Sequence, residues 1–252
     1  MSDLLLILIA LVGVLVGIVS VTVGSSSLIS LPFLIAVGLN PVAAVATNKL
    51  AVFSSLLLGG TKYYKSKVLS ERKLLVTLAC TALFGSIIGA NLVFKLNPLT
   101  LKIAVIVLSL LVLAITVIKK DLGQTDHLRI PSKLNYIQNL IAIFIISIYS
   151  GAIGLGAGTF MIFSFTYFLG YNFLKSSALM TIVNSASLIG ATLYFFQQEA
   201  INYQYGIPLL IGTSIGGWMG SYLAIKKGAK LIKKLFIAVS LFLILKLIVD
   251  LI

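Results

Sequence analysis

Residues 4–38 read LLLILIALVGVLVGIVSVTV-GSSS-LISLPFLIAVG, and this stretch contains the pattern on which the fold depends. The uncharged apolar run at 4–23 is long enough to cross a bilayer as a helix, which takes about 20 residues. A glycine- and serine-rich break at 24–27 ends it. The run at 28–38, which contains Pro32, is too short for an ordinary crossing. The stretch predicts a membrane helix followed by a short helix that spans or re-enters the membrane.

The composition of the whole chain indicates a membrane protein. The 252 residues are 60% hydrophobic and only 10% charged, and the mean hydropathy is +1.14. Soluble domains carry about 25% charged residues, so this chain has too few charges to cover a surface in water. A secreted globule, a disordered chain and a soluble enzyme are excluded. We expect an all-α integral membrane protein with about eight to ten transmembrane segments.

Further apolar runs, separated by glycine, proline and basic residues, fill the rest of the chain. They cover 42–60, 74–94, 99–118, 135–155, 159–170, 175–196, 207–225 and 235–251. The longest polar stretch lies between 118 and 135 and is the only candidate linker. We expect one membrane domain, 1–252, made of a first repeat at 1–118, a cytoplasmic linker at 119–134 and a second repeat at 135–252.

The second half repeats the order of the first: a long run, a break, a short run and three more runs. Residues 41–47 align with 175–181, and 85–89 align with 216–220, at offsets of 134 and 131. The second break falls at 154–159. Because each repeat has five segments, an odd number, the second copy is inverted in the membrane. Inverted repeats with broken or re-entrant helices are typical of secondary transporters.

The distribution of basic residues predicts the orientation. If the loop at 61–73 is cytoplasmic, the inverted arrangement places 15 of the 19 Lys and Arg residues in cytoplasmic segments and only Lys95 and Lys102 outside. The net charge of +13 therefore indicates membrane anchoring, and no nucleic-acid partner is expected. We expect a multi-pass protein of the cell (cytoplasmic or inner) membrane with both termini extracytoplasmic and the lipid bilayer as its main partner.

Residues 46–50 read ATNKL and follow a Gly/Ser break, a short proline-bearing run and Asn40-Pro41. In this context the segment resembles the TauE/SafE sulfite exporter family, whose members are also called sulfonate uptake permeases. Residues 154–160 and 175–187 resemble its second-half counterparts. One departure is that Gly24 is followed by three serines, where the family usually has a run of glycines. The resemblance implies transport of small sulfur-containing anions such as sulfite, thiosulfate or organosulfonates.

Lys49 is the strongest candidate for a binding residue. It is the eighth residue of the run at 42–60, so it is expected near mid-membrane, where a lysine costs roughly 2.5–3.5 kcal/mol. All six acidic residues lie in loops or at run ends, so no run offers a carboxylate. We therefore expect Lys49 to bind the anionic substrate. The alternatives are that backbone carbonyls in a break hold the ammonium, or that desolvation leaves it uncharged.

Hydrogen-bond donors around Lys49 are expected to complete the site. The hydroxyls and amides proposed for its wall belong to Thr47, Asn48, Thr181 and Asn184. The breaks would add backbone or hydroxyl donors from Gly24, Ser25, Ser26, Gly156, Gly158 and Thr159, because half-helix N-termini can hold anions. The same polar groups could equally join helices to one another.

Enzymatic chemistry is not expected. The only histidine, His127, lies in the linker, and no run contains a catalytic or metal-ligating cluster, so neither a metal nor a cofactor is predicted. We expect transport by alternating access, driven by an ion gradient. The sequence does not distinguish H+ from Na+ as the coupling ion, and it leaves open whether the protein forms a homodimer. Two alternatives are a passive anion channel on the same scaffold and a non-transporting membrane subunit that binds a partner protein through its lysine-rich loops.

The charge distribution yields a topology prediction. A reporter fused within 61–73, 119–133 or 226–234 should report a cytoplasmic position, and one within 197–206 or at either terminus should report the outside. Dual alkaline phosphatase and fluorescent-protein fusions measure this. A cytoplasmic signal from 197–206 would refute the inverted repeat.

Overall fold

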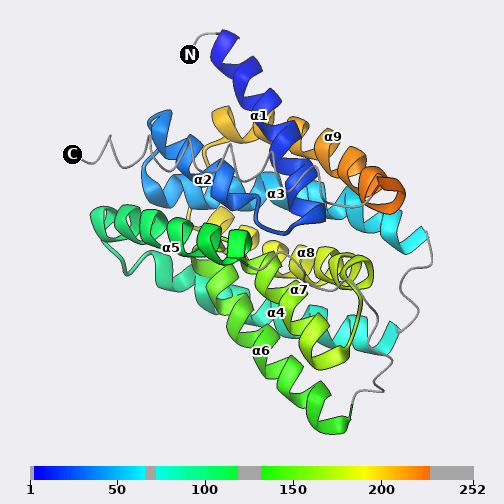
Figure 1. The fold of residues 1–252 in the computed structure, drawn as a ribbon. Helices are drawn as coiled ribbons and strands as arrows, with labels where there is room; N and C mark the ends of the chain where they lie inside the picture. Colours follow the sequence, from blue (N-terminus) through cyan, green and yellow to red (C-terminus); the bar gives the residue numbers. More distant parts are fainter. Residues whose placement is uncertain (1–2, 66–71, 119–131, 228–252) are drawn as a thin grey trace.

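The computed structural model describes residues 3–65, 72–118 and 132–227, and within these ranges the chain is helical without a strand (Figure 1). The helices are α1 (Asp3–Thr22), α2 (Ser27–Ala36), α3 (Pro41–Lys65), α4 (Arg72–Val93), α5 (Pro98–Ile118), α6 (Lys133–Ala152), α7 (Ala157–Leu169), α8 (Phe173–Gln197) and α9 (Tyr203–Lys227). The predicted run at 235–251 and most of the predicted linker lie outside the described residues.

The helices confirm the all-α membrane fold. Among the described residues, five segments are long and apolar enough to cross a membrane, by length and composition: Leu4–Thr22, Pro41–Tyr63, Arg72–Val93, Lys133–Ala152 and Phe173–Gln197. The two short runs form α2 and α7, of 10 and 13 residues, which are shorter than an ordinary crossing.

α9 begins before the apolar run that the sequence places at 207–225. The helix starts at Tyr203, so Pro208 lies inside it. The reason is a cap: the side-chain oxygen of Asn202 accepts hydrogen bonds from the backbone N–H groups of Gln204, at 3.1 Å, and Tyr205, at 3.3 Å. This cap stabilises the first turn before the proline is reached.

Caps also correct the alignment of the two halves. The side-chain oxygens of Asn40 and Asn172 each accept from the backbone N–H three residues later, both at 2.8 Å, and so start α3 and α8. The first residues of these helices, Pro41 and Phe173, are 132 residues apart. The sequence alignment paired Pro41 with Lys175, two residues too late. The order long, short, long of the helices recurs in the second half, while the inverted orientation stays a prediction.

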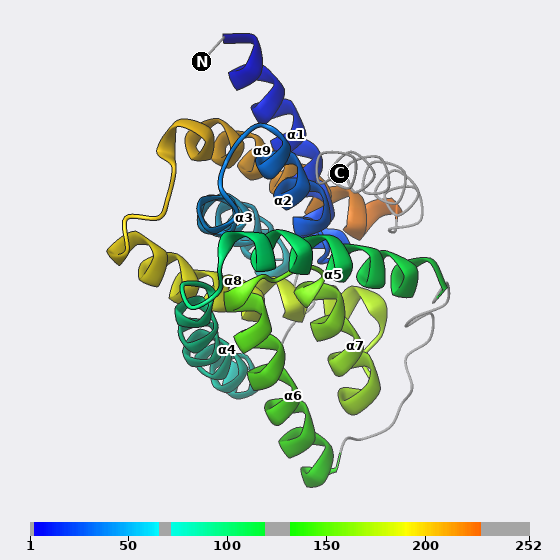
Figure 2. The same cartoon turned by 90° about the vertical axis from the view of Figure 1, so that its left-hand side faces the viewer.

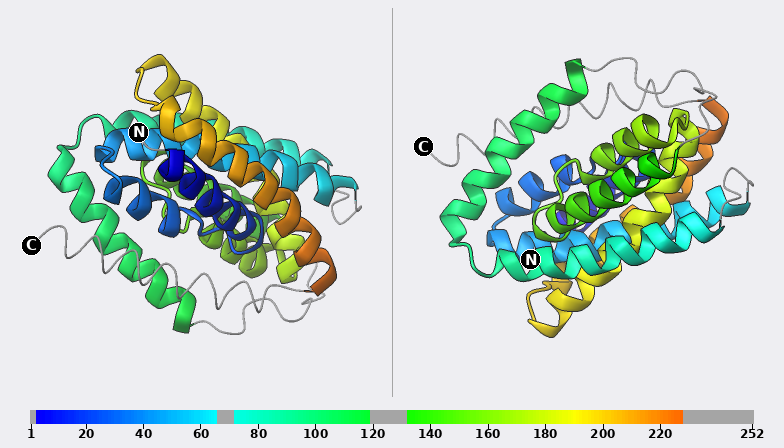
Figure 3. Two further views of the ribbon diagram at one scale, coloured as in Figure 1. Left: turned by 90° about the horizontal axis from the view of Figure 1, so that it is seen from above. Right: turned by 90° about the horizontal axis from the view of Figure 1, so that it is seen from below.

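The two halves of the chain interlock. α9, from the second half, packs along α1 of the first, and α4 of the first half packs along α6 of the second. α3 likewise packs on α9, and α8 on α4. Figures 1 and 2 show α1, α2, α3 and α9 together in the upper part and α4, α6 and α7 in the lower part, with α8 beneath α3. Figure 3 shows α5 along the outer edge, where it packs on α2 and α3.

Small residues allow these pairs of helices to approach closely, as the aligned glycines at 85–89 and 216–220 predict. A Cβ atom on Gly89 of α4 would lie 1.8 Å from the carbonyl oxygen of Ile148 on α6. One on Gly216 of α9 would lie 2.0 Å from the carbonyl oxygen of Val14 on α1. The backbones are therefore in direct contact at both interfaces.

Helix ends with basic residues gather on one side of the protein. Figure 1 shows the C-terminal ends of α3 and α9 and the N-terminal ends of α4, α6 and α8 on the right-hand side. These ends carry Lys62, Arg72, Lys73, Lys133, Lys175 and Lys226. The links that follow α2, α4 and α8 lie on the opposite side. The basic helix ends therefore share one side of the protein, and the assignment of that side to the cytoplasm stays a prediction.

The close contact at Gly89 leads to a stability prediction. Gly89→Ala should destabilise the protein by about 1–3 kcal/mol, because the added methyl must push α4 and α6 apart. The matched control is Gly60→Ala in α3, where the added Cβ would meet only side-chain atoms at 3.6 Å and should be neutral or slightly stabilising. Melting curves of both variants in detergent measure the difference. Equal melting temperatures would contradict the packing described for α4 and α6.

Candidate functional site

The two breaks predicted from the sequence meet in space. Gly24, in the break between α1 and α2, lies against Gly158 in the first turn of α7. A Cβ atom on either glycine would lie 2.6 Å from a backbone atom of the other, and Gly24 has a left-handed φ of 75°. Only glycines permit this contact. We refer to Gly24, Ser25, Gly158 and Thr159 as the crossing.

Two hydroxyl groups hold the crossing together. The side chains of Ser25 and Thr159 are hydrogen-bonded to each other, and the Thr159 hydroxyl lies 2.7 Å from the backbone carbonyl of Val23. Both side chains are buried. The crossing therefore joins the end of α1 and the start of α2 to the start of α7.

Backbone N–H groups gather at the crossing without acceptors. The first N–H groups of a helix have no partner within it. Among the described residues, the N–H groups of Ser26, Ser27, Gly158 and Thr159 make no hydrogen bond, and all four residues are buried. The Ser26 hydroxyl also makes none within the described chain. Two helix N-termini, each with a partial positive charge, thus meet in the interior with buried donors.

Lys49 is buried beside the second break, with only 1% of its surface exposed. Its ammonium donates to the backbone carbonyls of Ser150 and Ile153, the latter at 3.1 Å. These carbonyls belong to the C-terminal end of α6, where the helix dipole is negative. This contact corresponds to the alternative that the sequence leaves open, in which backbone carbonyls of a break hold the Lys49 ammonium. An ammonium has three N–H groups, and the described residues accept from two.

Gly154 makes room for the lysine. It has a left-handed φ of 79°, and a Cβ atom added to it would lie 2.4 Å from the Lys49 Nζ. Gly156, which is the N-cap of α7 and also left-handed, is at most about 7 Å further along the chain. The ammonium therefore lies close to the start of α7.

The two asparagines have different surroundings. The side-chain oxygen of Asn184 accepts from the Ser150 hydroxyl at 3.2 Å, which places Asn184 beside the carbonyl that Lys49 binds. Its amide N–H₂ has no acceptor among the described residues. Asn48 instead bonds to two serines of α2: it accepts from Ser30 and donates to Ser27 at 3.1 Å. Asn48 therefore attaches α3 to the first turn of α2.

Thr47 and Thr181 do not reach the crossing through any described hydrogen bond. The Thr47 hydroxyl accepts from the Asn202 backbone N–H at 3.0 Å. Asn202 lines a cavity of about 410 Å³ that also contains Glu199, whose carboxylate does not suit an anion. Thr181 donates to the Ser177 carbonyl of its own helix at 2.7 Å.

Sequence reasoning did not include Ser177 among the candidate site residues. Ser177 of α8 donates to the carbonyl of Thr22 at the end of α1, at 3.3 Å, just as Lys49 of α3 donates to the end of α6. The Ser150 carbonyl carries no sequence signal, because any residue supplies a carbonyl. Among the described residues, no group of His, Cys, Asp or Glu side chains could hold a metal ion.

Comparison with known proteins identifies the relatives of this chain. Residues 9–247 match the profile of the family described as Sulfite exporter TauE/SafE, which confirms the resemblance. The chain is 30% identical over 249 residues to the probable membrane transporter protein YfcA of Escherichia coli (strain K12), covering 99% of this chain and 91% of that protein. It is 28% identical to the probable membrane transporter protein ORF9 of Sinorhizobium sp, covering 93% and 88%. No solved structure matches.

The contact between Gly154 and Lys49 can be tested with a matched pair of variants. Gly154→Ala and Gly38→Ala both place alanine at a left-handed φ, which costs about 1–2 kcal/mol. A Cβ on Gly38 would meet nothing within 4 Å, whereas one on Gly154 would lie 2.4 Å from the Lys49 Nζ and 2.8 Å from the Ser150 carbonyl oxygen. Gly154→Ala should therefore lower the melting temperature clearly more than Gly38→Ala.

A double-variant cycle assigns the extra loss to the lysine. In a Lys49→Met background, the difference between the two alanine variants should shrink without vanishing, because the ammonium is gone while the contact with the Ser150 carbonyl stays. A difference of unchanged size in that background would show that Gly154 is needed for a reason other than Lys49.

Proposed function

Because the chain belongs to the sulfite exporter TauE/SafE family of membrane transporters, we propose that it is a secondary transporter that binds a small sulfur-containing anion at the crossing. Sulfite, thiosulfate and organosulfonates are the candidate substrates. The chain is an integral membrane transporter and not an enzyme, as its family and relatives indicate. The substrate, its site and the transport mechanism are the proposal.

One observation carries this proposal: buried N–H donors from the first turns of α2 and α7 have no acceptor within the described chain. Buried backbone N–H groups are nearly always hydrogen-bonded, so these donors call for an acceptor. An anion with several oxygens can accept from both helices at once. The two helix dipoles add an electrostatic attraction in a site that water does not screen.

Lys49 would neutralise the charge of the bound anion. Two of its N–H groups donate to carbonyls of α6, and in the proposed complex the third donates to the anion. The carbonyls would then position the ammonium, so the structural contact and the binding role do not exclude each other. Asn184, joined to the same end of α6 through Ser150, would donate its amide N–H groups.

The arrangement of the helices suits alternating access. At the crossing, the break between α1 and α2 meets the start of α7 through glycine backbones, the pair of hydroxyls and the bond from Thr159 to the Val23 carbonyl, so few side chains must be repacked when one group moves. In the inverted-repeat topology we propose, α1, α2, α3 and α9 would rock against α4, α6, α7 and α8. Each group contains helices of both repeats, so the motion would be rocking of one helix bundle against the other around a fixed site, as in other inverted-repeat transporters.

Flux through purified protein in liposomes tests this proposal. A radiolabelled panel of sulfite, thiosulfate, sulfate and taurine should give saturable uptake of at least one sulfur anion, with counterflow when unlabelled anion is inside. Gly158→Ala should reduce flux roughly tenfold or more, because the added Cβ meets the Gly24 carbonyl at 2.6 Å. Gly60→Ala is the control and should transport normally.

Three outcomes would contradict the proposal. Flux that does not saturate and shows no counterflow would indicate a passive channel. No flux of any anion by folded protein would favour a membrane subunit that acts through a partner. Normal flux by Gly158→Ala would show that the crossing does not line the transport path.

A further inference from the structure

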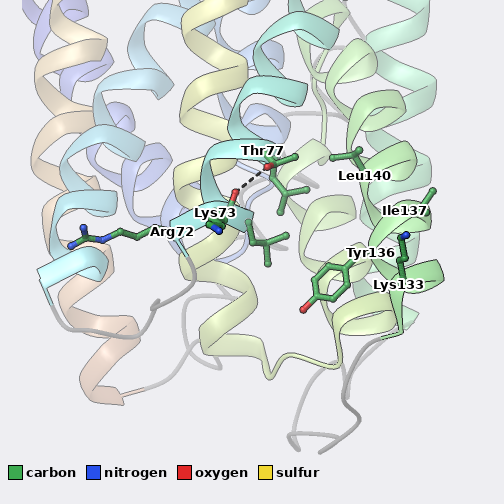
Figure 4. Close-up of a pocket in the computed structure, with 9 residues that line it drawn as sticks. Arg72, Lys73, Thr77, Lys133, Tyr136, Ile137 and Leu140 are labelled. Carbon is green, nitrogen blue, oxygen red and sulfur yellow. Dashed lines mark hydrogen bonds between the residues drawn. The ribbon is translucent and has the colours of Figure 1, made fainter.

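We propose that a groove between the N-terminal halves of α4 and α6 binds an anionic phospholipid of the surrounding leaflet, with its phosphate among basic side chains and its acyl chains along the groove. This site is separate from the crossing and does not depend on the identity of the transported anion. Figure 4 shows the groove.

The groove combines a basic end with an apolar floor. Its cavity measures about 690 Å³ and has residues of both helices in its lining. The basic end consists of Arg72 and Lys73 in the first turn of α4 and Lys133 at the first position of α6. Apolar side chains continue from it along the two helices: Leu74, Leu78, Ile137 and Leu140. An anionic phospholipid has the same two parts, a charged headgroup and apolar acyl chains.

The positive charge at this place is unfavourable for the two helices by themselves. Both α4 and α6 begin here, and a helix N-terminus has a partial positive charge that repels nearby cations. Neither helix has an acidic residue in its first turn, and the described lining of the groove contains no carboxylate. In Figure 4 the Arg72 guanidinium points away from Lys133, so the two lysines and the two helix N-termini are the groups that attract an anion to this end of the groove.

The surroundings favour a lipid over a free anion. Apolar side chains beside the groove are largely exposed and would face hydrocarbon: 63% of the surface of Val76, 61% of Leu134 and 55% of Ile141. In Figure 4 the phenol of Tyr136 turns from α6 toward α4, and tyrosine is common at the headgroup level of membranes. Basic pockets between transmembrane helices bind anionic headgroups, and an acyl chain can cover the apolar floor.

Lipid binding to purified protein tests this inference. Native mass spectrometry and melting curves should show that phosphatidylglycerol binds and stabilises the protein more than phosphatidylcholine does. Lys73→Gln/Lys133→Gln should weaken the affinity for phosphatidylglycerol about thirtyfold, which corresponds to about 1 kcal/mol for each basic residue.

The matched control removes the same charge at the same side of the protein. Lys62→Gln/Lys226→Gln changes lysines that lie over the aromatic rings of Trp218 and Tyr222, with Lys62 4.2 Å from the Trp218 centroid. This variant should keep the preference for phosphatidylglycerol. Equal losses in both variants would indicate general surface attraction and overturn the proposal.

Two further outcomes would also overturn it. Glycerol 3-phosphate alone should not reproduce the stabilisation, since it lacks acyl chains; if it did, the groove would be a site for soluble anions. An equal effect of phosphatidylcholine and phosphatidylglycerol on the wild-type protein would show that the basic residues do not select the lipid.

Discussion

The buried ammonium of Lys49 is the constraint around which the centre of this protein is arranged. A lysine at mid-membrane is costly, and the described chain offers it no carboxylate. The carbonyls at the end of α6 meet the charge instead, and they can do so only because α6 stops there. The break then requires left-handed glycines at 154 and 156, and α7 begins beside the ammonium. The buried charge of Lys49, the end of α6 and the break before α7 therefore depend on one another.

The two halves share a plan but differ in charge. Lys49 of α3, in the first half, donates to a carbonyl at the end of α6. Ser177 of α8, in the second half, donates to a carbonyl at the end of α1. The helix order and the asparagine caps also recur. Only one of the two equivalent helix ends is therefore met by a cation. A single anion bound at the crossing would have its charge balanced from one side.

The sequence predicts the elements better than it predicts their contacts. Hydropathy, glycine breaks and prolines locate the helices to within a few residues, because the length of an apolar run is a local property. Local signals also miss some boundaries, as when Asn202 starts α9 before Pro208. The sequence left open that carbonyls of a break hold Lys49, but neither the residues that supply them nor the contact between Gly24 and Gly158 could be predicted, since backbone groups have no residue-specific signal. Thr47 and Asn48 are buried and join helices in the structure, which is the alternative that the sequence leaves open for the polar groups around Lys49.

The position of a bound anion tests the central claim most directly. Crystals grown with selenite, a heavier analogue of sulfite, would reveal the anion in an anomalous difference map. Our account predicts a peak between the first turns of α2 and α7, within hydrogen-bonding distance of the N–H groups of Gly158 and Thr159 and of the Lys49 ammonium. A peak found only elsewhere, such as in the basic groove between α4 and α6, would contradict it.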